Sequence, residues 1–82
     1  MRWKYRFMFE NEQFYQYAYA RESDELDGII QYDKITCRRT LIKLCSTDSS
    51  EIGAELSARK ALEHFYSVIE RGFPEYCYVC CG

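Results

Sequence analysis

The sequence is short of the residues and runs on which many enzymes and membrane proteins depend. It has a single histidine, His64, and it contains neither a nucleophile elbow nor a glycine-rich phosphate loop. No apolar run is long enough to span a membrane, and no apolar core follows the basic N-terminus as it would in a signal peptide. The familiar signatures of catalysis and membrane insertion are therefore missing, and we expect a cytoplasmic protein.

His64 does not make up for this shortage of catalytic groups. None of the residues three or four positions away from it is a carboxylate that could orient its imidazole on a helix. Ser67 is too close in sequence to form a convincing nucleophile–base pair with it. We predict a histidine at the boundary of the core, no catalytic residues and no enzymatic activity.

The five cysteines are an odd number, and without an export signal they are not expected to form a disulfide framework. Cys77 and Cys80 have the C-x-x-C spacing of zinc ligands, but no second such pair occurs. Tyr78 and Val79 between them are strand formers, and in a strand the two thiols would point to opposite faces. We predict reduced thiols that pack as small apolar groups, with neither a metal nor another cofactor.

Aromatic side chains are abundant. The 82 residues include eight tyrosines, five phenylalanines and one tryptophan, which together make up 17% of the chain. A chain of this length forms one domain and buries only about 60–65% of its unfolded surface, so large rings are an efficient source of apolar contact. The formal net charge of −2 disfavours a dedicated binder of nucleic acid or anionic membranes.

Alternating side chains predict the strands. From Trp3 to Phe9 the aromatic residues alternate with basic residues and a methionine, and from Tyr15 to Ala20 tyrosines alternate with other residues. The polar segment between these runs predicts a hairpin. After the acidic loop 21–28, adjacent Leu41 and Ile42 in the fourth strand indicate either a bulge or a strand with apolar contacts on both faces. The third, fourth and fifth strands are expected at Ile29 to Asp33, Ile35 to Cys45 and Tyr76 to Cys81.

One long amphipathic helix is predicted from Ser49 to Gly72. Asp48 and Glu51 have the spacing of a capping box, and Gly72 two residues before Pro74 is a stop signal. The chain is therefore expected to form a single α+β domain over residues 1–82. It would have an antiparallel sheet of about five strands, in the order ββββαβ, with the helix packed on one face. The apolar stripe of this helix comprises Ala54, Ala58, Ala61, Leu62, Phe65, Val68 and Ile69.

The register of the first hairpin decides which side chains share a face, and two registers fit the sequence. If Phe9 lies opposite Tyr15, nearly all aromatic residues share one face and the charged residues share the other. If Phe9 lies opposite Phe14, the tyrosines of the second strand share a face with the cations of the first. The former register separates polarity better and suits a sheet with one buried face.

A protein partner, including a second copy of the chain, is the interaction that the sequence favours. One helix covers only one face of such a sheet, and Ile52 and Leu56 add apolar area on the polar side of the helix. The predicted contact surface comprises these two residues together with Tyr15, Tyr17 and Tyr19. A homodimer is the simplest assembly that would use it.

Single-stranded nucleic acid is the alternative ligand. Sheets that bind it combine exposed rings, on which bases stack, with cations that meet phosphates. The second of the two registers would place Lys4 and Arg6 beside Tyr17 and Tyr19 on one face. The acidic composition ranks this function below protein binding.

Overall fold

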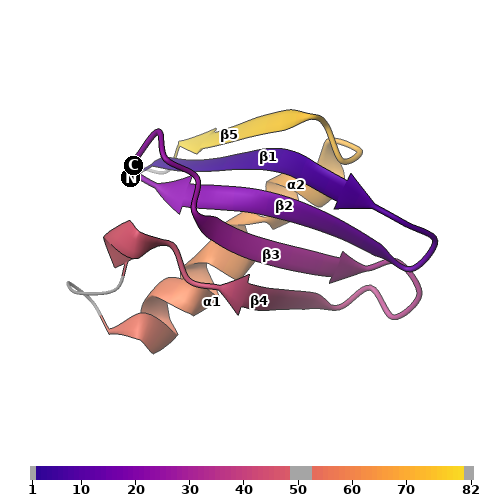
Figure 1. Ribbon diagram of the computed structural model, residues 1–82, viewed down its shortest axis with the longest axis horizontal. Coiled ribbons are helices and arrows are strands. Elements are labelled where there is room, and N and C mark those ends of the chain that lie inside the picture. The colour runs from indigo at the N-terminus through magenta and orange to yellow at the C-terminus, as the bar shows by residue number, and fades with distance from the viewer. Residues whose placement is uncertain (1, 49–52, 81–82) are drawn as a thin grey trace.

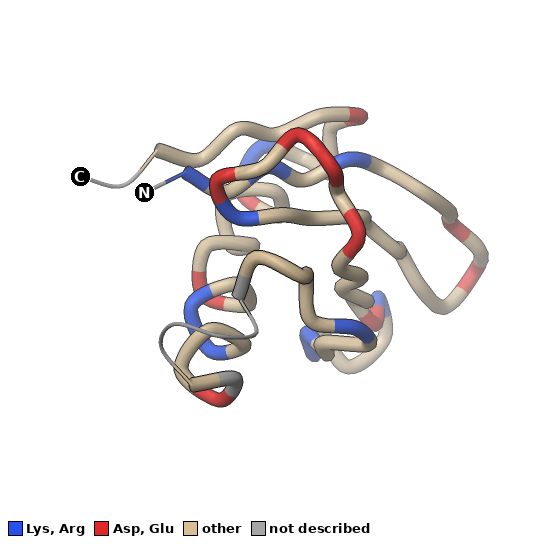
Figure 2. Tube along the Cα trace, turned by 60° about the vertical axis from the view of Figure 1, so that its left-hand side comes forward, with Lys and Arg blue, Asp and Glu red and all other residues tan. Residues whose placement is uncertain are grey.

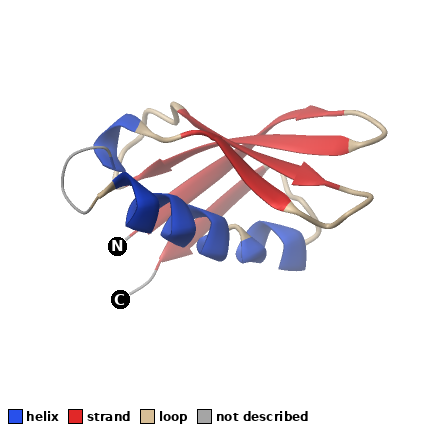
Figure 3. Cartoon of the chain, turned by 90° about the horizontal axis from the view of Figure 1, so that it is seen from below, coloured by secondary structure: helices blue, strands red, loops and turns tan. Residues whose placement is uncertain are grey.

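The chain forms an antiparallel sheet with helices on one side, as the sequence predicts (Figures 1 and 3). The computed structural model describes residues 2–48 and 53–80. Strands follow one another across the sheet as a meander, and the last strand pairs with the first, giving the order β4-β3-β2-β1-β5. The strands are β1 (Arg2–Glu10), β2 (Phe14–Arg21), β3 (Gly28–Asp33), β4 (Arg39–Lys43) and β5 (Tyr76–Cys80). The helices are the short η1 (Ser46–Asp48), α1 (Ala54–His64) and α2 (Tyr66–Glu70).

The hairpin of β1 and β2 begins in the register that separates polarity. Tyr5 pairs with Tyr19 and Phe7 pairs with Tyr17, so these rings share the face toward the helices. A bulge then follows, because the next paired residue of β1 is Phe9 and its partner is Gln16. The extra residue reverses the alternation, and Phe9 therefore lies on the opposite face of the sheet from Phe7.

The core lies between the sheet and the helices, and Phe65 is at its centre. Its ring contacts those of Tyr5 and Tyr17 edge-on, with centroid distances of 5.6 and 5.4 Å. All three residues are fully buried. The core cluster comprises Trp3, Tyr5, Tyr17, Tyr19, Ile30, Cys45, Ala61, Phe65, Val68, Cys77 and Val79.

Three buried tyrosine hydroxyls link the sheet to the segments that cover it. The Tyr5 hydroxyl donates to the Ala61 carbonyl at 2.7 Å, and the Tyr17 hydroxyl donates to the Pro74 carbonyl at 2.5 Å. The Tyr19 hydroxyl accepts the backbone N–H of Cys45 at 3.0 Å. These bonds offset the desolvation of the hydroxyls, and each bond contributes about 0.5–1.5 kcal/mol net.

The predicted single helix is shorter and bent. It begins at Ala54, after Gly53 with a φ of 65°, whereas the predicted start and Glu51 of the capping box lie outside the described residues. The bend is at Phe65, whose carbonyl accepts the Val68 N–H in a tightened turn. The sequence has neither proline nor glycine at this position, and its helical pattern of apolar residues continues past Phe65. The bend could therefore not be predicted from the sequence.

The predicted end of the helix is confirmed. Gly72 has a φ of 78°, the left-handed conformation that glycine adopts without a steric penalty. Its N–H bonds to the Ile69 carbonyl, and the Phe73 N–H bonds to the Val68 carbonyl. This pair of bonds is the Schellman motif, which satisfies carbonyls at the helix end.

The fourth strand is also shorter than predicted, beginning at Arg39 instead of Ile35. The Asp33 carboxylate accepts the N–H groups of Ile35 and Thr36, and the Cys37 N–H bonds to the Asp33 carbonyl. These bonds fold the expected start of the strand into a turn.

The predicted bulge in this strand is present. Leu41 pairs with Ile30 and packs on the core, while Lys43 pairs with the adjacent Ile29. Ile42 is therefore the extra residue, and its side chain is exposed.

Removing the central ring should destabilise the fold. We expect Phe65→Ala to lower the free energy of unfolding by about 3–5 kcal/mol, because the truncation leaves a cavity against Tyr5 and Tyr17. Urea unfolding of the variant measures this loss. Tyr66→Ala at the exposed neighbour is the control and should change stability by less than about 0.5 kcal/mol. A loss from Phe65→Ala as small as that of the control would contradict this packing.

Gly28 is required for close approach to the ring of Tyr19. A Cβ atom at residue 28 would lie 2.2 Å from Cε1 of Tyr19, its partner across the β2–β3 ladder. The backbone N–H of Cys45 donates to the Tyr19 hydroxyl, so the ring cannot move away without losing this hydrogen bond. We therefore expect Gly28→Ala to cost about 1–3 kcal/mol of stability. The penalty should largely disappear in a Tyr19→Ala background, as a double-mutant cycle would measure. An equal penalty in both backgrounds would place its cause elsewhere.

Candidate binding face

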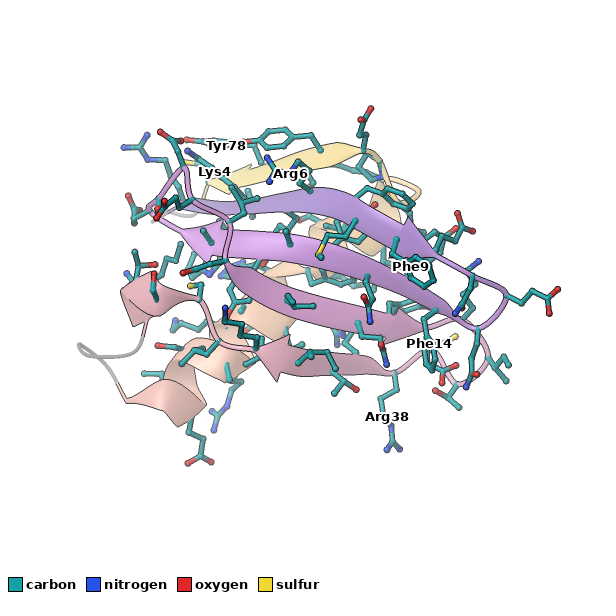
Figure 4. All side chains as sticks on the ribbon, in the orientation of Figure 1. Lys4, Arg6, Phe9, Phe14, Arg38 and Tyr78 are labelled. Atoms are coloured by element: carbon teal, nitrogen blue, oxygen red, sulfur yellow. The ribbon has the colours of Figure 1, made fainter. Side chains whose placement is uncertain are left out.

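Within the described ranges, helices α1 and α2 pack on one face of the sheet and neither covers the other face (Figure 3). Strand register assigns side chains to this second face, which we call the open face. Lys4, Arg6, Phe9, Phe14 and Tyr78 project from it toward the viewer in Figure 4. The open face carries Lys4, Arg6, Phe9, Phe14, Gln16, Gln31, Tyr76 and Tyr78. Met8, the unpaired residue of the bulge, is two residues after Arg6 and lies on the same face by alternation.

Basic side chains of β1 are paired with tyrosines of β5 on the open face. Lys4 of β1 is the direct partner of Tyr78 in β5, and Arg6 is the direct partner of Tyr76. Directly opposed residues have Cβ atoms about 4.5–5.5 Å apart, so each cation lies beside a ring. The tyrosine side chains are accessible, with Tyr76 49% and Tyr78 39% exposed. We call Lys4, Arg6, Tyr76 and Tyr78 the basic–tyrosine row.

The other end of the open face, beside the β1–β2 turn, is apolar. Met8 and Phe9 are each 48% exposed. Phe9 pairs with Gln16, and Phe14 is two residues before Gln16, so the two phenylalanines are diagonal neighbours on the same face. Both lie at the turn end of the hairpin in Figure 4. We call Met8, Phe9 and Phe14 the hairpin patch.

An acidic loop, residues 22–27, approaches the basic end of β1. Asp24 forms an ion pair with Lys4, and Glu22 accepts the backbone N–H of Arg2 at 2.7 Å. Figure 2 shows the acidic segments of this loop beside the N-terminal end of the chain. The hydrogen bond from Lys4 lowers the pKa of Asp24, so the carboxylate stays charged at neutral pH. Because the Asp24 carboxylate is almost fully exposed to solvent, the pair contributes little to stability.

Arg6 differs from Lys4 and Arg2, because it has no acidic partner in the described part of the chain. Its side chain is exposed, and no carboxylate within the described ranges forms an ion pair with it. It lies beside Tyr76, further along β1 from the acidic loop. The basic–tyrosine row thus combines one engaged cation with one whose charge is open to an incoming anion.

The two edges of the sheet are less suited to contact than the open face. At the β5 edge, the Arg71 guanidinium donates to the Tyr78 carbonyl at 3.3 Å and thereby occupies an acceptor that another strand would need. At the β4 edge, the bulge at Ile42 and the charged residues Arg39 and Lys43 disturb regular pairing. Proteins use both devices to discourage the addition of a further strand.

The predicted tyrosine surface does not form. Tyr17 and Tyr19 are fully buried on the helix side of the sheet, opposite Lys4 and Arg6, so the four residues predicted as a nucleic-acid face are not brought together. The expectation considered only the tyrosines of β2. Those of β5 reach the cations instead, through a pairing of distant segments for which the sequence carries no local signal.

The remaining predicted contact residues are spread over the molecule. Tyr15 is half-buried and stacks on Phe73 with ring centroids 4.0 Å apart, and the Lys34 ammonium lies 4.5 Å from its ring centre. Leu56 on α1 is 40% exposed, as the prediction requires, whereas Ile52 lies outside the described residues. Tyr15 and Leu56 do not belong to the open face.

The cysteines show the predicted alternation along β5. Cys77 faces the core beside Tyr5, where burial raises the pKa of its thiol, and Cys80 is exposed on the opposite face. The four cysteines within residues 2–48 and 53–80 carry free thiols. No group of three potential metal ligands gathers among the described residues.

His64 packs against Trp3, with ring centroids 4.1 Å apart. Partial burial lowers the pKa of its imidazole, which favours the neutral form at pH 7. In the part of the chain that the structure describes, His64 has no hydrogen bond to a carboxylate or a nucleophile. This environment is that of a histidine at the core boundary.

None of the helices in the described ranges is both long enough and apolar enough to cross a membrane. The sequence matches no protein-family model, and no curated protein or solved structure is significantly similar to it.

Proposed function

We propose that this chain is a non-catalytic protein-binding module that contacts its partner through the open face, centred on the hairpin patch. The observation that supports this proposal is that Met8 and Phe9 remain half exposed beside Phe14 on the open face. Exposed apolar groups gathered on one surface are typical of protein interaction sites. The Gln16 amide bonds to the Gln31 side chain at 2.8 Å next to this patch and supplies a polar border.

A second copy of the chain is the partner that we propose first. A stable dimer buries about 800 Å² per subunit, and the accessible surface of this chain is 5048 Å². About one sixth of the surface would therefore be needed, which one exposed residue such as Leu56 cannot supply. An extended sheet face can approach that area, whereas both sheet edges carry features that oppose pairing.

Self-association through the hairpin patch can be measured by sedimentation equilibrium at micromolar concentrations. We expect a reversible dimer, and we expect Met8→Ser combined with Phe9→Ser to weaken it by at least about tenfold through loss of central apolar contacts. Tyr66→Ser is the matched control, because Tyr66 is an equally exposed apolar residue on helix α2.

The outcome can contradict the proposal in two ways. A strictly monomeric chain over this range would exclude the second copy as the partner. A dimer that survives the change at the hairpin patch but is lost in Tyr66→Ser would place the interface on the helices instead.

A further inference from the structure

We propose that the basic–tyrosine row is a second binding site, for single-stranded nucleic acid, separate from the hairpin patch. The site consists of two cation–tyrosine pairs in direct register, Lys4 with Tyr78 and Arg6 with Tyr76. Neither pair belongs to the core, and both tyrosines are accessible from the open face.

The two tyrosines are suited to stack on neighbouring bases. Tyr76 and Tyr78 are two residues apart in β5, so their side chains project from the same face about 7 Å apart. Their rings can each receive one base, and stacking of this kind tolerates any base because every base has a π-face. Paired bases inside a duplex do not expose those faces, which is why the proposed ligand is a single strand.

The cations beside these rings complement the phosphates of the same strand. Arg6 is exposed and free of ion pairs within the described ranges, so it can meet a phosphate without first losing a partner. Lys4 is half-buried and must exchange Asp24 for a phosphate, but an ion pair whose carboxylate is open to solvent is worth only about 0–1 kcal/mol. Arg2 lies at the end of the row, where its guanidinium approaches the Tyr78 hydroxyl at 3.5 Å.

The acidic loop limits the strength of this site. Asp24 and Glu22 neutralise part of the positive charge at the end of β1, and the chain as a whole carries a formal charge of −2. Binding should therefore be modest and strongly dependent on salt. If Arg2, Lys4 and Arg6 each contact one phosphate of a single strand, a plot of log K against log salt concentration should have a slope of about −2. Raising salt from about 50 to 200 mM would then weaken binding by about 20-fold.

Fluorescence anisotropy with a labelled single-stranded oligonucleotide of about 12 nucleotides tests this site on the full chain. We expect salt-dependent binding that falls by about 5- to 150-fold in Tyr76→Ala, through loss of a stacking platform. Tyr76→Phe should retain binding, because stacking does not use the hydroxyl. Asp24→Asn should strengthen binding by releasing Lys4. Tyr66→Ala is the tyrosine control on α2.

Charge is tested separately from stacking. Arg6→Ala should weaken binding and make the salt slope shallower by about one phosphate contact, whereas Arg59→Ala on α1 removes the same charge from another surface and should leave the slope unchanged. Inorganic polyphosphate serves as a competitor that has phosphates but no bases. It should compete poorly for the wild-type chain because it cannot stack on Tyr76 and Tyr78.

No binding at low salt, binding insensitive to Tyr76→Ala, or equal binding of polyphosphate would each exclude a stacking site for nucleic acid. These outcomes are distinguished from a failure of the proposed protein contact, because the Met8 and Phe9 variants test that contact by sedimentation without oligonucleotide. Loss of oligonucleotide binding in the row variants with intact self-association would support two separate sites.

Discussion

Three tyrosine hydroxyls, buried between the sheet and the segments that cover it, set the constraint on which this fold depends. Tyr5, Tyr17 and Tyr19 place large rings in the core, but each ring carries a polar group that must be paired there. Their partners are backbone groups of α1, of the segment leading into β5 and of the segment after β4. An unpaired buried group would cost about 1–3 kcal/mol, so these bonds fix where the helices and the connections lie on the sheet.

This arrangement also determines what the other face presents. Because the tyrosines of β1 and β2 point toward the helices, the basic residues between them point away. The bulge after Phe7 then reverses the alternation and brings Phe9 to the open face. β5 places Tyr76 and Tyr78 beside the cations of β1, since it pairs antiparallel with that strand. One face thus gains an apolar end and a basic, aromatic row from the same local rules that build the core.

Local patterns predict the strands, the helix end and the bulge at Ile42, because each has a signal within a few residues. The alternation in β1, the glycine before Phe73 and Pro74, and the adjacent Leu41 and Ile42 are examples. The bulge after Phe7 and the bend at Phe65 lack such signals, and the run from Ile35 gives no sign that the turn at Asp33 delays the fourth strand until Arg39. The basic–tyrosine row could not be predicted from the sequence either. Alternation assigns a residue to a face of the sheet, but it does not specify which strand lies next to it.

The division of the tyrosines between a buried set and an exposed set is the central claim, and residue-resolved nitration measures it most directly. Limited treatment of the native chain with tetranitromethane, followed by peptide mass spectrometry, would rank the tyrosines by accessibility. We predict that Tyr76 and Tyr78 are modified early, while Tyr17 and Tyr19 stay protected until the chain unfolds. Early modification of Tyr17 or Tyr19, with Tyr76 protected, would contradict this assignment of the two faces.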